Sequence, residues 1–209
     1  MKSKTNHGFS LLELLITIAI ILILAGMATV TLVPTMSGNH VDSAYSTALM
    51  SLRNTRYLAI TQSHEYVVTF NPGGYPAGTI EVQYQPPAIA GVFPPLQLVQ
   101  TLTIPSDTSF AVYSGFPAVT PDGFGTGLAA MDFGYLPTGG GGGSSQVVFM
   151  PDGSARDLLG NYSSGVLYIT RPSAPNMYSS RAVTVWGATG RIRGWKLFQV
   201  GATPTWTQQ

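Results

Sequence analysis

The residue types that usually perform catalysis are sparse and scattered in this sequence. The chain contains no cysteine, which excludes disulfides, thiolate nucleophiles and cysteine-bound metals. His40 and His64 lie far apart, and no HExxH, GxSxG or P-loop pattern is present. Asp122 and Asp152 each stand in a Pro-Asp-Gly sequence, where the aspartate typically bonds back to the backbone and the glycine takes a positive φ. We therefore expect no enzymatic activity, no cofactor and no metal site, calcium included.

A different chemistry is indicated by the basic sequence GRIR at 190–193. Beyond residue 157 the chain has five basic residues and no acidic residue, whereas 9–157 holds nine acids and three arginines. The five are Arg171, Arg181, Arg191, Arg193 and Lys196. Arginines at i and i+2 of a strand point to the same face of a sheet. This asymmetry indicates a basic patch that could bind phosphates weakly, without sequence preference and with salt sensitivity.

Two interpretations of this basic region stay open. If Trp186 and Trp195 are exposed, they could stack on nucleic-acid bases beside the arginines. Alternatively, GATGRIRG is a hairpin turn whose arginines are solvated or pair with acids of a neighbouring subunit, and both tryptophans lie in the core. The chain without its first eight residues is close to neutral, so long-range attraction to DNA would be modest.

Glu13 stands in a membrane-length apolar run, HGFSLLELLITIAIILILAGMA. The twenty residues Leu14–Val33 carry no charge, and a helix of that length spans about 30 Å, the thickness of the hydrocarbon core. Lys2 and Lys4 precede the run, so the N-terminus is expected in the cytoplasm. A secretory signal peptide fits less well, because the run is long and has no clear small-residue cleavage site. A carboxylate in lipid is tolerable once it pairs with a cation.

The sequence GFSLLEL around Glu13 resembles the prepilin motif of the type IV filament superfamily, which includes type IV pilins and type II secretion pseudopilins. The resemblance implies that a membrane peptidase cleaves between Gly8 and Phe9 and N-methylates Phe9. It also implies that Glu13 pairs with the N-terminal amine of a neighbouring subunit. Many pilins have a helix-kinking proline near the position of Val30. Here Pro34 comes one turn later, so any bend is displaced.

The remaining sequence predicts one helix followed by strands. An apolar stripe at three- and four-residue spacing predicts an amphipathic helix over about 41–63, packed on a sheet, with Arg53 and Arg56 solvated or bridging to that sheet. The stripe comprises Val41, Tyr45, Ala48, Leu49, Leu52, Arg56, Ala59 and Ile60. Eight β-branched or aromatic segments separated by Gly and Pro turns predict strands. These segments are 65–70, 78–85, 96–104, 108–113, 145–150, 165–170, 181–186 and 192–200.

Together these patterns predict an α+β fold, with a long N-terminal helix packed on an antiparallel β-sheet domain, and the resemblance implies that this fold is pilin-like. The expected parts are a leader (1–8), a transmembrane and assembly helix (9–34), an amphipathic helix (35–63) and a β-rich globular domain (64–209). The glycine-rich sequence at 139–145 predicts a flexible connector. The loop-rich region 72–145 has no assigned role.

The order of LRNTRYLAITQSHEYVVTFNP, VVFMPDGSA, GVLYITR and RAVTVWGATGRIRGW is similar to that of the GspH/FimT family of minor pilins and pseudopilins. The resemblance implies a minor subunit of a type IV pilus-like or type II secretion filament, acting in assembly, priming or protein secretion. It implies anchoring in the bacterial inner membrane, a periplasmic globular domain, and a periplasmic or extracellular filament after assembly. Other pilin subunits, a prepilin peptidase and the membrane are the implied partners.

The resemblance also carries an alternative function. The sequence GRIR is similar to the C-terminal GRxR of DNA-binding FimT-type minor pilins, which serve DNA uptake. The alternative is therefore a minor pilin that binds double-stranded DNA through Arg191 and Arg193, with support from Lys196, Arg181 and Arg171. The sequence does not choose between pilus and secretion machine.

Overall fold

The computed structural model describes residues 10–72, 78–89, 91–113, 115–135, 143–172, 177–201 and 203–209, without the side chains of 28–38 and 135. The chain divides into two compact units, Met1–Gly38 and Asn39–Gln209, and each is described by itself. Part of the predicted connector 139–145 lies outside the described residues. The predicted cleavage site at Gly8 and Phe9 does so as well.

Helix α1 (Leu11–Gln62) is the first element and the longest, with 52 residues. Its backbone is helical through Pro34, so the proline does not end the helix. Its described N-terminal part, 11–27, exposes every side chain, including leucines and isoleucines. The predicted membrane segment 9–34 lies partly outside the described residues. Within what the structure describes, no helix has the length and apolarity needed to cross a membrane.

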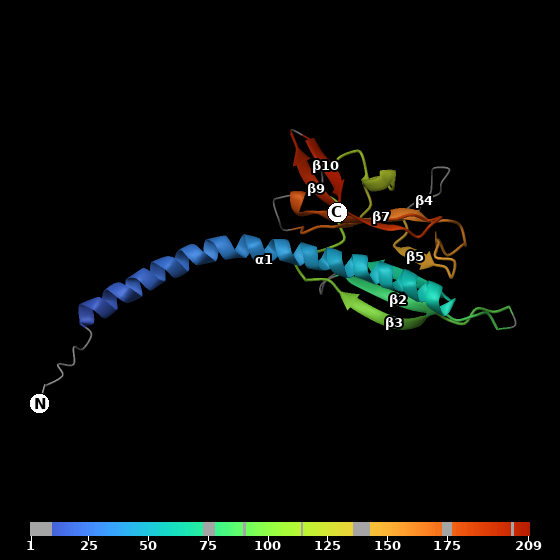
Figure 1. Ribbon diagram of the computed structural model, residues 1–209, viewed down its shortest axis with the longest axis horizontal. Helices are drawn as coiled ribbons and strands as arrows, with labels where there is room; N and C mark the ends of the chain where they lie inside the picture. The colour runs from blue at the N-terminus through green and yellow to red at the C-terminus, as the bar shows by residue number, and fades with distance from the viewer. Residues whose placement is uncertain are drawn as a thin grey trace, which may run out of the picture. The chain divides into compact units, whose positions relative to one another are not determined.

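The described residues of the unit Asn39–Gln209 form two antiparallel five-stranded sheets beside the second half of α1 (Figure 1). The first sheet has the order β3 (Gln97–Thr103), β2 (Thr79–Gln85), β1 (Glu65–Asn71), β5 (Gln146–Phe149), β6 (Ala155–Arg156). The second has the order β10 (Thr203–Gln208), β9 (Ile192–Val200), β8 (Arg181–Val185), β7 (Ser164–Ile169), β4 (Met131–Tyr135). Two short 3₁₀ turns, η1 (Pro121–Gly123) and η2 (Met177–Ser179), lie in the connections. The α+β class is confirmed, with two sheets in place of the single sheet expected.

Seven of the eight predicted strands form, and the strand predicted at 108–113 is wrong. Only Ser109 in that segment makes a ladder contact, a single bridge to Thr170. Phe110 is buried instead, and its ring meets that of Phe70 edge to face at 5.8 Å. The segment thus contributes a side chain to the core without joining a sheet. Strands β4, β6 and β10 were not expected, because each is short or contains Gly or Pro.

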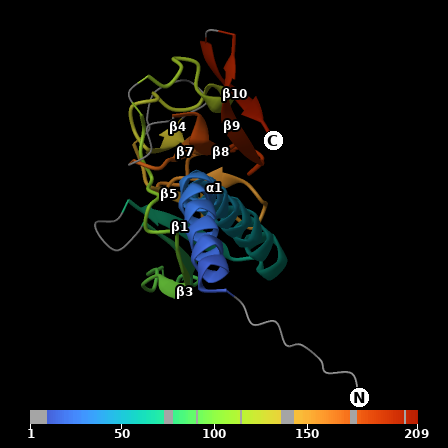
Figure 2. The same cartoon turned by 90° about the vertical axis from the view of Figure 1, so that its left-hand side faces the viewer.

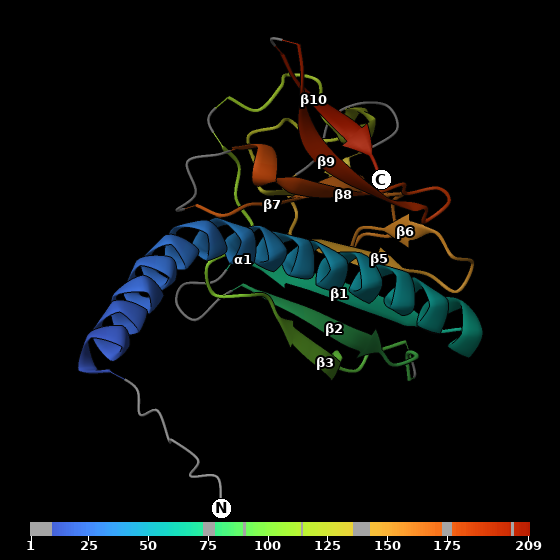
Figure 3. The ribbon, with the colours of Figure 1, turned by 60° about the vertical axis from the view of Figure 1, so that its left-hand side comes forward.

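The main core lies where α1 meets both sheets. Val41, Ala48, Leu52 and Ala59 on the predicted apolar stripe are fully buried, as the 3.6-residue period requires. They pack with the inner faces of both sheets in one cluster, and Figure 3 shows this half of α1 between β1–β3 and β7–β8. Gly194 on β9 allows the close approach, because a Cβ there would collide with the Tyr45 ring.

A second apolar cluster covers the other face of the second sheet. It comprises Val166, Tyr168, Ala182, Leu197 and Trp206. Phe116, from the long connection between β3 and β4, packs on it with its ring 5.3 Å from that of Trp206. Figure 2 shows this yellow-green connection beside the strands of the second sheet. Part of the loop-rich region 72–145 therefore serves as the cover of a sheet face.

Candidate functional site

Glu13 lies in the first turn of α1 with an exposed side chain. Its backbone N–H donates to the Ser10 carbonyl at 3.0 Å, which starts the helix. An acid in the first turn also suits the positive end of the helix dipole. No acid–base partner for Glu13 lies within the described residues. Its pairing with another subunit therefore stays a prediction.

Arg193 is held by a network centred on Asp122. Its Nη1 donates to Asp122 Oδ1 at 2.6 Å, and the two side chains are 21% and 5% exposed. The other oxygen of Asp122 accepts bonds from Thr184 Oγ1 at 2.6 Å and Trp186 Nε1 at 3.1 Å. The Arg193 guanidinium also lies 5.5 Å from the Trp186 ring. Arg193 thus joins a buried polar network that links η1 to β8 and β9.

The two Pro-Asp-Gly sequences behave differently. Asp152 forms the expected turn, because its Oδ1 accepts the Ser154 N–H at 2.8 Å and Gly153 takes a φ of 80°. Bonds from Ser154 lower the pKa of the Asp152 carboxyl below its ordinary value. At Asp122 the expected positive φ of the glycine is confirmed, because Gly123 has a φ of 73°, but the expected bond from the aspartate back to its own turn is wrong. Asp122 itself takes a positive φ of 54°, and its carboxylate points across to β8 and β9 in place of its own turn.

Two more of the predicted basic residues have acidic partners in the same chain. Arg181 is buried, with its Nη2 2.7 Å from Asp42 Oδ1 on α1. Arg171 Nε lies 3.2 Å from Asp107 Oδ2, and His40 Nδ1 lies 2.9 Å from the other oxygen of the same carboxylate. Asp42, Asp107 and Asp122 all precede residue 157, whereas their arginines follow it. The charge asymmetry along the sequence is therefore largely cancelled in the fold.

Arg191 and Lys196 differ from these three. Arg191 precedes β9 in the turn and its side chain is exposed. Lys196 has its Nζ 5.0 Å from the Phe198 ring. Neither has an acidic partner in the part of the chain that the structure describes. Three of the five predicted basic residues are thus paired with aspartates, and Arg191 and Lys196 are the two whose charge no described acid neutralises.

Trp186 and Trp195 are neither fully exposed for base stacking nor fully buried in the core, which were the two interpretations of the sequence. Trp186 is 37% exposed, and its ring meets Phe124 edge to face at 4.9 Å. Trp195 is half-buried, and its Nε1 donates to Thr184 Oγ1 at 3.0 Å. Both indole N–H groups are therefore satisfied inside the fold, and Trp186 keeps part of its surface accessible.

A hollow that the sequence did not indicate lies between α1 and the β8–β9 turn, and we call it the cationic hollow. Its volume is about 520 Å³. It is lined by Arg53, Arg56, Thr189, Gly190, Arg191 and Ile192. None of these residues is acidic. The one sequence signal was the i, i+3 spacing of Arg53 and Arg56, which places two like charges on one side of a helix.

Arg56 anchors the turns that form this hollow. Its Nε donates to the Gly153 carbonyl and its Nη2 to the Thr189 carbonyl, each at 3.0 Å. Of the two alternatives expected for Arg53 and Arg56, Arg56 bridges to the turns of the sheets, whereas Arg53 is exposed. Gly190 takes a φ of 58°, and a Cβ there would strike the Gly153 carbonyl. The helix and the two turns therefore meet in a fixed arrangement, with neutral carbonyls as the partners of a full positive charge.

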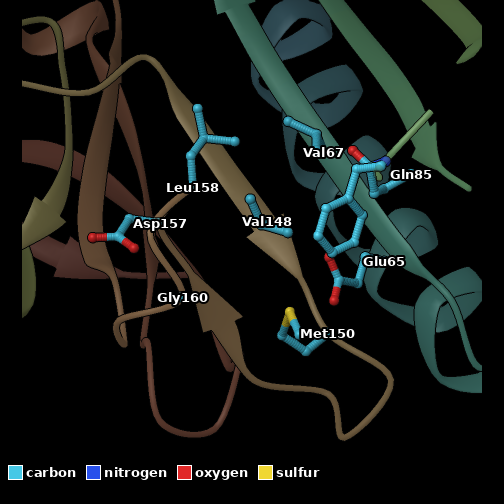
Figure 4. Close-up of a pocket in the computed structure, with 9 residues that line it drawn as sticks. Glu65, Val67, Gln85, Val148, Met150, Asp157, Leu158 and Gly160 are labelled. Carbon is cyan, nitrogen blue, oxygen red and sulfur yellow. The ribbon is translucent and has the colours of Figure 1, made fainter. Parts of the chain in front are cut away.

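An acidic pocket of about 190 Å³ opens on the other sheet (Figure 4), and we call it the Glu65 pocket. Its lining is Glu65, Val67, Gln85, Phe93, Val148, Met150, Asp157, Leu158 and Gly160. Asp157 accepts the backbone N–H groups of Leu159 and Asn161 at 2.9 and 2.8 Å. Across the described residues, no three potential metal ligands cluster here or elsewhere.

Comparison with known proteins gives one result, at the N-terminus. No curated protein and no solved structure matches the chain. Residues 3–29 match the prokaryotic N-terminal methylation motif, a range that contains Gly8, Phe9 and Glu13. Such a motif implies processing by a prepilin peptidase and assembly with other pilin subunits, in a class that is structural and not catalytic. This motif, ahead of an α+β body, supports the type IV pilin and pseudopilin class for the chain.

Proposed function

We propose that the chain is a minor pilin or pseudopilin of a type IV pilus-like or type II secretion filament, acting in assembly, priming or protein secretion. The observation that carries the proposal is the methylation motif at 3–29. The motif overlaps the start of α1, where Glu13 is the one acid among exposed apolar side chains. Apolar side chains without cover in the single chain require lipid or neighbouring helices. The minor role rests on the GspH/FimT-like order of segments.

The proposal includes a processing site, a topology and an assembly contact. Cleavage falls between Gly8 and Phe9, and Phe9 becomes the methylated N-terminus. The segment 9–34 spans the inner membrane before assembly, with the body in the periplasm. In the filament, the Glu13 carboxylate pairs with the Phe9 amine of a neighbouring subunit, which removes an unpaired charge from an apolar environment.

Co-production of the full chain with a prepilin peptidase tests this function. Mass spectrometry of the isolated chain should show the loss of residues 1–8 and the gain of one methyl group. Glu13→Ala should be processed normally but recovered poorly in sheared filaments. Thr17→Ala is the matched control, because it changes a neighbouring turn of α1 without removing a charge. Normal recovery of Glu13→Ala would refute the pairing, and an unprocessed wild-type chain would refute the class.

Binding of double-stranded DNA is the second candidate function. It is favoured by Arg191, which is exposed without an acidic partner among the described residues and borders the cationic hollow. Phosphate contacts by Arg191 and Lys196 would be weak and salt-sensitive. Duplex DNA titrated at low and moderate salt should then bind the wild-type chain but not Arg191→Gln with Lys196→Gln. Arg156→Gln is the control, since Arg156 pairs with Asp152. Absence of binding at low salt excludes this function.

A further inference from the structure

Hydrogen bonds and ion pairs account for almost every acid of the unit Asn39–Gln209. Within its described residues, each aspartate and Glu81 has at least one such partner. Glu65 is the exception, and it lies at the edge of its own pocket (Figure 4). Arg53 and Arg191 are likewise exposed cations without an acid in the described chain. Glu65 and these two exposed arginines thus remain on two different surfaces, besides the half-exposed Lys196.

The Glu65 pocket has the chemistry of a receptor for a long cationic side chain. Its carboxylate stands beside apolar walls, of which Phe93 and Leu158 are 65% and 64% exposed. The floor is formed by Val67 and Val148, which are nearly fully buried. An arginine or lysine can lay its aliphatic stem along such walls while its charged group meets the carboxylate. The exposed ring of Phe93 adds a face for a cation–π contact.

The cationic hollow offers the complementary group. Arg53 and Arg56 lie one turn apart on α1, where like charges repel each other. The guanidinium of Arg56 is occupied by two carbonyls, whereas that of Arg53 is exposed at the surface. Arg191 lines the same hollow from the turn. A carboxylate from outside the chain would relieve this repulsion.

We propose that the Glu65 pocket of one copy binds Arg53 of a second copy, with Arg191 of that second copy at the edge of the contact. The inference rests on the proposed function in one respect, which is that the chain assembles side by side with pilin subunits, and it takes a second copy of the chain as that neighbour. Because the two surfaces differ, the contact is heterologous and can repeat into an open filament. DNA fits this hollow less well, since Arg171, Arg181 and Arg193 already pair with aspartates and leave few cations for an extended phosphate track.

Charge-swap variants of the full chain in detergent micelles test this contact. Self-association is measured by sedimentation velocity at low and moderate salt. Glu65→Arg and Arg53→Glu should each weaken association about tenfold or more, and their mixture should restore it, because each supplies the charge that the other lacks. Glu81→Arg is the control with the same charge change, and it should associate like the wild type. Thermal unfolding monitored by circular dichroism verifies that each variant is folded.

Three results would overturn the proposal. They are unchanged association of both single variants, failure of the mixture to restore association, and duplex DNA binding that Arg53→Glu abolishes while self-association persists. Prepilin peptidase processing of the same variants distinguishes a failure of this contact from a failure of the proposed pilin function. Normal processing without restored association rejects the contact alone, whereas failed processing of the wild type rejects the pilin function.

Discussion

The substitution Asp122→Asn should show how strongly the Asp122 network stabilises the body. The carboxylate is 5% exposed and accepts bonds from Arg193, Thr184 and Trp186. Asparagine keeps the size of the side chain and tolerates the positive φ of this position. The substitution therefore removes the negative charge with little backbone strain, and Arg193 keeps its charge without a counter-ion.

The expected loss of stability is about 2–4 kcal/mol. Removing one partner of a fully buried ion pair costs roughly 3–5 kcal/mol, and the 21% exposure of Arg193 reduces that figure through solvation. A hydrogen bond to a charged group contributes about 1.5–3 kcal/mol, which gives a similar magnitude. For a unit of this size, each kcal/mol lowers Tm by roughly 2–4 °C, so Tm should fall by about 4–16 °C.

Thermal unfolding of the full chain in detergent, followed by near-ultraviolet circular dichroism, measures this loss. Arg193→Gln should cost a similar amount. The double variant Asp122→Asn with Arg193→Gln should lose less than the two single losses added together, because the ion pair is removed only once. A fall in Tm below about 2 °C for Asp122→Asn, or additive single losses, would refute the view that this network is a strong structural link.

Three further changes test other parts of the fold. Leu52→Ala removes a fully buried side chain between α1 and the sheets and should cost about 2–5 kcal/mol in urea unfolding; a loss below 1 kcal/mol would contradict this packing. Gly194→Ala should destabilise the folded chain by about 1–3 kcal/mol, because the added methyl group collides with Tyr45. In a chain that already carries Tyr45→Ala, the same Gly194→Ala substitution should cost less. Burial, aided by the Asp132 carboxylate, raises the pKa of Tyr168 above its ordinary value of 10.0. Stability from this group is therefore complete below that value and falls as pH rises above it. Tyr168→Phe should flatten the decline of Tm in alkaline buffer, and an unchanged decline would contradict the assignment.

Local patterns were sufficient for the class of elements and for the N-terminal motif. The apolar stripe of Val41, Ala48 and Leu52 identifies the buried face of a helix, because side chains three and four residues apart share one side. Seven strands follow from short β-branched or aromatic segments between turns. The motif around Glu13 is contiguous in sequence, so its recognition needs no tertiary contact.

Only the tertiary structure decided which charged side chains pair with each other. Arg171, Arg181 and Arg193 form a basic cluster in sequence, but each meets an aspartate that lies from 64 to 139 residues earlier in the chain. Such pairs depend on how the sheets and α1 pack together, and local propensity carries no information on them. The same packing places Arg53 beside Arg191 and leaves Glu65 without a partner in the described chain. The sequence by itself therefore determined that this chain has a prepilin-type motif and an α+β body, whereas the folded chain decided which charges remain available to other molecules.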